Sequence, residues 1–188
     1  MIVKEDAKIL FDNYLSLFPE EKKKFSLLLE QMQSDEDIFS RKNFRGHITA
    51  SGLVISPERK VLALFHKKLQ RYLQPGGHIE NEDRDLENSA KREVIEEAGL
   101  NDIKPHPWHK KTGSPILIDT HPIPENEKKQ EDAHYHHDLM FIFFTEKGSV
   151  SLDQNEVSDF IWTDIDTVLE DNSNIAKALK KMKELGIV

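Results

Sequence analysis

Apolar residues at helical spacing occupy the first part of the chain. They recur at steps of three, four and seven, at Leu10, Tyr14, Leu17 and Phe18 and again at Phe25, Leu28, Leu29 and Met32. This spacing predicts two amphipathic helices with a break near Pro19. The acidic residues 35–37 that follow are typical of a solvated connection. We therefore expect residues 1–40 to form a helical appendage whose apolar faces cover another part of the molecule.

From His47 onward the pattern changes to short runs that are rich in β-branched residues. These runs predict strands at residues 48–55, 61–65, 116–119, 139–145 and 157–162. A helix is expected from about residue 85 to residue 98, because Gly99 is the residue type that commonly follows a helix end. A final helix is expected at residues 174–185. This order predicts an α/β domain with a mixed central sheet over residues 41–188.

Composition narrows the classes of function. With 188 residues, one catalytic domain with an appendage is the expected organisation. The net charge of -8 argues against a nucleic acid polymer as partner, and the absence of cysteine excludes thiolate metal sites and cysteine nucleophiles. The chain has neither a secretory signal pattern nor an apolar run long enough for a bilayer. We therefore expect a soluble cytoplasmic protein without a membrane partner.

The helix expected near residues 85–98 carries three glutamates on one face. Glu93, Glu96 and Glu97 stand three and four positions apart, so their side chains converge within an arc of roughly 100°. Like charges this close repel one another, and a hard cation such as Mg²⁺ or Mn²⁺, which prefers oxygen ligands, is their natural partner. The alternative is an ordinary acidic helix face, since 32% of the residues are charged.

The neighbours of these glutamates favour the metal site. Arg92 precedes Glu96 by four positions, so an ion pair within the helix could orient that carboxylate. The glycine pair Gly76–Gly77 predicts a tight turn without side chains, which would let backbone carbonyls approach the same ion. An isolated acidic triplet is usually structural, and it is the joint occurrence of these features that favours metal binding.

These residues resemble the signature of the Nudix hydrolases, which runs Gly, five residues, Glu, seven residues, then Arg-Glu-apolar-x-Glu-Glu-x-Gly-apolar. Arg92 to Leu100 matches the second half at every fixed position. Five residues separate Gly77 from Asp83, as in the pattern, but eight rather than seven separate Asp83 from Arg92. We interpret the difference as a one-residue extension of the loop before the helix, where added length costs little. It leaves the role of Glu82 or Asp83 open.

The resemblance covers about residues 45–170 and implies the Nudix α/β/α sandwich, preceded by the helical appendage. It implies metal ligation by Glu93, Glu96, Glu97 and the Gly76 carbonyl, with Arg92 as the orienting partner. Carboxylates outside the signature often assist the metal or activate water in this family. Glu156, just before a late strand, stands in such a place, and a solvent-exposed loop glutamate is the alternative.

A histidine-rich run at residues 134–138 is a candidate substrate site. If the run enters the following strand, His134, His136 and Asp138 point to one face of the sheet. Two imidazoles and a carboxylate could contact a phosphate-bearing substrate or bind a transition metal. A polar strand entrance with solvated histidines is an equally good interpretation. Residues 118–124 could line the same pocket.

The resulting functional hypothesis is metal-assisted hydrolysis of a phosphoanhydride bond, without a covalent intermediate. Either Glu96 or Glu156 would orient or deprotonate the attacking water. The resemblance implies a small-molecule substrate, a nucleoside diphosphate linked to another moiety. The alternative is a catalytically silent nucleotide-binding or regulatory protein of the same fold. Prenyl diphosphate isomerases share a related fold but need a cysteine, which this chain lacks. The appendage could complete the pocket, mediate a homodimer or cap the sheet edge.

Overall fold

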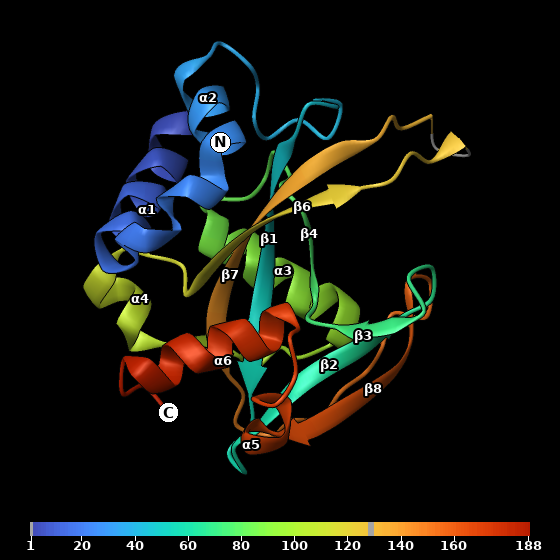
Figure 1. The fold of residues 1–188 in the computed structure, drawn as a ribbon. Coiled ribbons are helices and arrows are strands. Elements are labelled where there is room, and N and C mark those ends of the chain that lie inside the picture. Colours follow the sequence, from blue (N-terminus) through green and yellow to red (C-terminus); the bar gives the residue numbers. More distant parts are fainter. Residues whose placement is uncertain (1, 128–129) are drawn as a thin grey trace.

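A mixed β-sheet with helices packed against it forms the body of the protein (Figure 1). The computed structural model describes residues 2–127 and 130–188. The helices are α1 (Lys4–Leu17), the 3-10 helix η1 (Pro19–Phe25), α2 (Ser26–Gln33), α3 (Leu86–Ala98), α4 (Pro107–Thr112), α5 (Ile165–Val168) and α6 (Asn174–Glu184). The strands are β1 (His47–Ile55), β2 (Lys60–His66), β3 (Arg71–Leu73), β4 (Gly76–His78), β5 (Lys104–Pro105), β6 (Leu117–Ile123), β7 (His134–Phe144) and β8 (Val157–Asp164).

The parallel pair β1 and β7 forms the centre of this sheet. Strand β1 also pairs antiparallel with β2 and with the short β4, while β6 and β5 pair antiparallel with β7 and β8 with β2. The β1–β7 register places His47 opposite His136. The β1–β4 register places Thr49 opposite His78 and Ser51 opposite Gly76. Two segments far apart in sequence, the glycine turn and the histidine run, therefore both lie beside the start of β1.

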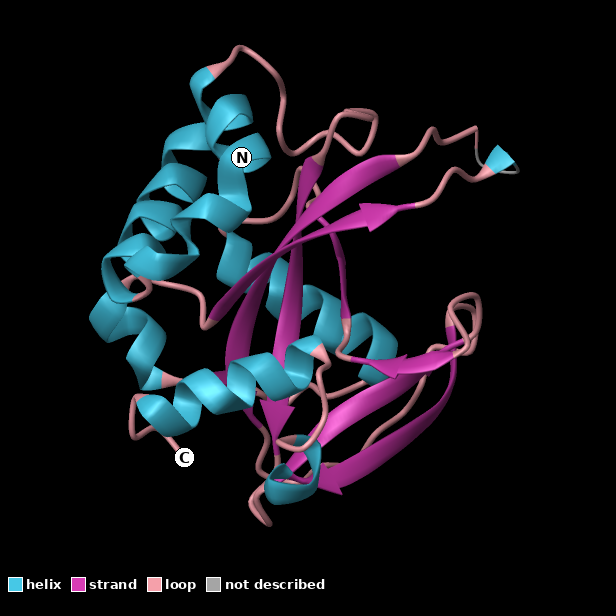
Figure 2. Ribbon diagram, in the orientation of Figure 1, coloured by secondary structure: helices cyan, strands magenta, loops and turns pink. Residues whose placement is uncertain are grey.

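Helices cover both faces of the sheet, as predicted for an α/β sandwich (Figure 2). Side chains alternate between the faces along each strand. Leu139, Phe141 and Phe143 of β7 pack in one apolar cluster with α3 and the N-terminal helices. Met140 and Ile142 pack in a second cluster with α6. The predicted fold class is confirmed.

Local signals in the sequence fix the position of α3. The Asp85 side chain accepts a hydrogen bond from the Asn88 amide at 2.7 Å and caps the N-terminus, and Gly99, with φ of 66°, ends the helix. A Cβ added at Gly52 of β1 would lie 2.3 Å from a Val94 methyl carbon, so α3 sits directly on the strand backbone. This close approach holds the glutamate face of α3 against the edge of the β1–β4 pair.

The N-terminal helices share their core with the sheet. Phe11, Tyr14 and Phe25 are buried in the same cluster as the α3 face of β7. The predicted apolar face of the first helix was partly wrong: Leu17 is 38% exposed and Phe11 is buried instead, because the buried stripe runs through Ala7, Phe11, Tyr14 and Phe18 at steps of four and three. The appendage also reaches α6, through the ion pair between Lys181 and Glu21 at 3.2 Å.

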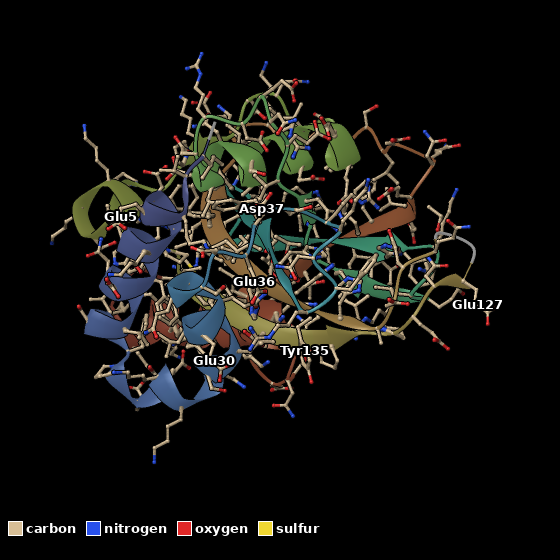
Figure 3. All side chains as sticks on the ribbon, turned by 90° about the horizontal axis from the view of Figure 1, so that it is seen from above. Glu5, Glu30, Glu36, Asp37, Glu127 and Tyr135 are labelled. Carbon is tan, nitrogen blue, oxygen red and sulfur yellow. The ribbon has the colours of Figure 1, made fainter. Side chains whose placement is uncertain are left out.

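Polar contacts fasten α2 to the start of the sheet. Gln31 donates to the Gly46 carbonyl at 2.7 Å, and its Oε1 lies 2.9 Å from Nε2 of His137. Arg45 donates to Glu36 at 2.7 Å, and Figure 3 labels Glu36 on the segment after α2. In the described part of the chain, no helix combines the length and the apolar character needed to cross a membrane.

Candidate active site

Two glutamates of α3, the buried Glu97 and the half-buried Glu93, lie against the glycine turn. The Gly76 amide donates to Glu97 Oε2 at 3.3 Å. A Cβ added at Gly77 would lie 2.5 Å from Glu93 Oε1, so only glycine leaves room for this carboxylate. The β4 strand that carries both glycines is held by its pairing with β1. The structure thus brings the turn and two of the three predicted metal ligands together, with the Gly76 amide rather than its carbonyl contacting Glu97.

The electrostatic state of these two carboxylates is unusual. Burial raises the pKa of Glu97 to about 8, and the nearby charge of Glu93 adds to this rise. Burial likewise raises the pKa of Glu93 to about 7, against the opposing effect of Arg92. Two acids that resist ionisation at neutral pH form a site that a cation would stabilise, because the cation favours their charged forms.

Arg92 connects the site to the loop before α3. Its guanidinium donates to Asp83 through Nε at 3.0 Å and through Nη2 at 3.1 Å. Nη1 donates to Glu93 and to Glu96, each at 2.9 Å, and Nη2 reaches the His78 carbonyl at 2.8 Å. Burial works to raise the pKa of Asp83, but the hydrogen bonds that it accepts outweigh burial and keep this pKa below its ordinary value. Asp83 therefore reaches Arg92 despite the one-residue extension.

The remaining predicted acids lie nearer to solvent. The Glu96 side chain is 54% exposed and is held by Arg92. Glu156 precedes β8 and is exposed, and its backbone carbonyl accepts from the Lys67 amide at 3.0 Å. Its charge contributes to the raised pKa values of both Glu93 and Glu97, so it lies within electrostatic reach of both. Glu93 and Glu97 of α3 and Glu156 of the segment before β8 thus lie within electrostatic reach of one another.

The donor set fits a hard divalent cation. Carboxylate oxygens of Glu93 and Glu97 lie against a turn that has no side chains, and oxygen donors are those that Mg²⁺ and Mn²⁺ prefer. The space above Gly77, which a Cβ would fill, is taken by Glu93 Oε1. Asp153 was not anticipated as part of this site, although its charge also raises the pKa of Glu97. Only its closeness to Glu156 in sequence could have indicated it.

The predicted histidine face also exists. His134 and His136 project from β7 on the same side, and their Nε2 atoms lie 3.2 Å apart. Asp138 shares this face but is buried, and it accepts hydrogen bonds from Ser51 at 2.6 Å and Thr49 at 3.1 Å. Burial raises the pKa of Asp138. Both of its oxygens are thus engaged by hydroxyl groups of β1.

Three further histidines surround this pair, and only His121, in the segment 118–124 expected to line the same pocket, was anticipated there. His47 and His78 pack their rings 4.7 and 5.3 Å from the His136 ring, and His121 lies 5.8 Å from it. Burial, together with the other histidines, lowers the pKa of His136 to about 2 and that of His78 to about 4, so these rings are neutral. Residues 118–124 were expected to lie near the histidine run. They do so because β6 pairs with β7, which places His121 opposite His136.

Comparison with known proteins identifies the class of this fold and site. Residues 46–184 match the family model of the NUDIX domain. The chain therefore belongs to the NUDIX family, and the resemblance based on Arg92–Leu100 is confirmed. The match begins after the N-terminal helices.

Three similar proteins can be named individually. The chain is 31% identical over 105 residues to a probable DHNTP pyrophosphohydrolase from Lactococcus lactis subsp. cremoris. That match covers 56% of this chain and 58% of the relative, which is less than two thirds of the relative's length. A NUDIX-family hydrolase from Clostridium perfringens has a TM-score of 0.53 at 22% identity, covering 74% of this chain and 97% of that one. The C. elegans Ap4A hydrolase in a binary complex has a TM-score of 0.51 at 15% identity, covering 73% and 96%. At these identities the structural likeness establishes the fold alone.

Proposed function

We propose that the protein is a divalent-metal-dependent pyrophosphohydrolase that cleaves a phosphoanhydride bond in a nucleoside diphosphate derivative. The observation that carries the proposal is the pair of Glu97, which is buried, and Glu93, which is half-buried, against the Gly76–Gly77 turn with raised pKa values. Membership of the NUDIX family supports it, as does the name of the Lactococcus relative.

We assign the cation, Mg²⁺ with Mn²⁺ as a substitute, to Glu93, Glu96 and Glu97 with Gly76 beside them. When bound, such an ion polarises phosphoryl oxygens and stabilises the leaving phosphate. Arg92 positions Glu93 and Glu96 through its Nη1 contacts at 2.9 Å. In the reaction, water adds to one phosphorus while the bridging P–O bond breaks, which yields two phosphate products.

Glu156 is the better candidate for the base. Glu96 accepts a hydrogen bond from Arg92 at 2.9 Å, so one of its oxygens is already engaged by a cationic side chain. Glu156 lies close enough to Glu93 and Glu97 to affect their pKa values and is open to solvent. Glu156→Gln should lower kcat by about 10²–10⁴ and leave Mg²⁺ affinity nearly unchanged. Glu170→Gln, another exposed glutamate, is the control. Equal kcat in the two variants would remove Glu156 from the mechanism.

We place the remainder of the substrate against the sheet face that carries His134 and His136, with Asp138 as a buried support for that face. This assignment rests on the nearness of the histidine run to the glycine turn: Arg92 contacts both Glu93 and the His78 carbonyl, and the His78 ring lies 5.3 Å from that of His136.

The test is a substrate panel of nucleoside triphosphates, DHNTP, Ap4A and ADP-ribose, with and without Mg²⁺, with phosphorus NMR or chromatography to identify both products. We expect metal-dependent release of two phosphate products from at least one member. Tight binding of these nucleotides without turnover would favour the alternative, a nucleotide-binding or regulatory protein.

A further inference from the structure

Three histidine nitrogens from two strands converge at the start of the sheet. The ligand atoms of His47, His134 and His136 all lie within 4.8 Å of one another. His47 comes from β1 and the other two from β7, and the parallel register places His47 opposite His136. The Nε2 atoms of His134 and His136 lie 3.2 Å apart. Two ligands of a tetrahedral ion with Zn–N bonds of about 2.0–2.1 Å would be separated by about 3.3 Å, so this spacing suits a shared ion.

Backbone carbonyls orient two of the rings. Nδ1 of His47 lies 3.2 Å from the Asn43 carbonyl, and Nδ1 of His134 lies 2.7 Å from the Asp132 carbonyl. A carbonyl only accepts, so each Nδ1 carries the proton and each Nε2 presents a lone pair. Histidines that bind metals are usually held in this way, with the outer nitrogen donating to a carbonyl or carboxylate.

The Nε2 atom of His47 provides an independent indication of a ligand. His47 has no exposed surface, and among the described residues its Nε2 has no hydrogen-bond partner. A buried polar atom without a partner costs about 1–3 kcal/mol. His47 also brings a ring nitrogen to within 4.8 Å of the ligand nitrogens of the other two imidazoles. The cost is removed if the atom binds a cation there.

We propose that His47, His134 and His136 form a second metal site, selective for a transition ion of the Zn²⁺ class. Three imidazole nitrogens suit borderline ions, whereas Mg²⁺ prefers oxygen. The fourth coordination position would be left to water or another exchangeable ligand, so a substrate group placed at this face would meet His134 and His136 through the ion. Because it joins β1 to β7, the ion would stabilise the fold.

This site is distinct from the carboxylates of α3. Neighbouring residues of β4 point to opposite faces of the sheet. Gly77 faces Glu93, whereas His78 packs its ring 5.1 Å from that of His47. The β1–β4 pair thus separates the two groups of ligands, and neither site depends on the other being occupied.

The first test measures Co²⁺ and Zn²⁺ binding to the full chain without a polyhistidine tag. One equivalent of Co²⁺ should bind with the intense visible absorption of a tetrahedral site, apart from any weakly absorbing Co²⁺ at the carboxylates, and Zn²⁺ should displace it and raise the unfolding temperature. His47→Gln and His136→Gln should weaken binding by about 100-fold or more, since loss of even an outer-shell partner costs about 10–100-fold. His66→Gln, on β2, should bind as the wild type does. Equal binding by all variants would overturn the proposal.

The second test needs no variant and separates this proposal from the proposed function. X-ray absorption of the Zn²⁺-loaded wild type should show about three imidazole nitrogens at about 2.0–2.1 Å. An all-oxygen shell would place the ion among the carboxylates and overturn the proposal. Glu97→Gln should retain tetrahedral Co²⁺ binding; its loss in this variant would also contradict a histidine site. Turnover by the wild type tests the hydrolase proposal alone.

Discussion

Asp83→Asn tests how the extended loop before α3 is held. The Asp83 side chain is 5% exposed and that of Arg92 is 19% exposed, with two hydrogen bonds between them at 3.0 and 3.1 Å. Asparagine keeps the shape of the Asp83 side chain but removes its negative charge. Its NH2 group would also face one guanidinium N–H of Arg92 and could not accept that hydrogen bond. Breaking a buried ion pair costs about 3–5 kcal/mol. Arg92 retains Glu93 and the His78 carbonyl, so a smaller loss of about 2 kcal/mol in unfolding free energy is expected.

For a chain of this length, about 2 kcal/mol lowers the unfolding temperature by roughly 4–8 °C. The assay is thermal and urea unfolding, followed by circular dichroism without added metal. Glu82→Gln is the matched control, because Glu82 is the adjacent acid but is exposed, and its effect should stay within about 0.5 kcal/mol. The reasoning fails if Asp83→Asn is as stable as the wild type, or if Glu82→Gln is destabilised equally.

Three further predictions concern the turn, the buried acids and the appendage. Gly77→Ala should raise the Mg²⁺ concentration for half-maximal rate by about tenfold or more, since the new Cβ would lie 2.5 Å from Glu93 Oε1; an unchanged Mg²⁺ dependence would contradict this contact. In the metal-free protein, the pKa of Glu97 is raised from its ordinary value of 4.5 to about 8. The stability that Glu97 contributes is therefore present at low pH and is lost as pH rises across this interval. Mg²⁺ should therefore stabilise the wild type more at about pH 8 than at about pH 6 in thermal scans, and this difference should be smaller in Glu97→Gln. Tyr14→Phe should cost about 1–2 kcal/mol in urea unfolding, because it removes the hydroxyl that donates to buried Glu21; a neutral substitution would mean that the contact does not contribute.

Features determined by local sequence were predictable. Helix α3 was expected at residues 85–98 and spans Leu86–Ala98, because Asp85 and Gly99 provide its cap and its end. Its glutamate face followed from spacing alone. Helix α4 was missed, although His106 caps it and Gly113, with φ of 61°, ends it. Six residues are too few for a periodic apolar pattern to be recognised.

Features determined by non-local pairing were not predictable. His47 and His136 are brought together only by the parallel register of β1 and β7, which the sequence does not encode locally. The closeness of Asp83 to Arg92 depends on how an extended loop folds back, and a fixed spacing rule does not describe this. Burial of Asp138 by Thr49 and Ser51 likewise depends on the sheet rather than on the histidine run.

The central claim is that the glutamate face of α3 binds the metal required for hydrolysis. The most direct measurement is the initial rate of phosphoanhydride cleavage against Mg²⁺ concentration, for the wild type, Glu97→Gln and the control Glu87→Gln on the same helix. We predict a saturable Mg²⁺ dependence for the wild type and the control. Glu97→Gln should lose about 100-fold or more in kcat/KM while remaining folded, because metal-assisted catalysis accounts for several kcal/mol. Wild-type turnover that is independent of Mg²⁺, or a Glu97→Gln variant as active as the control, would contradict the account.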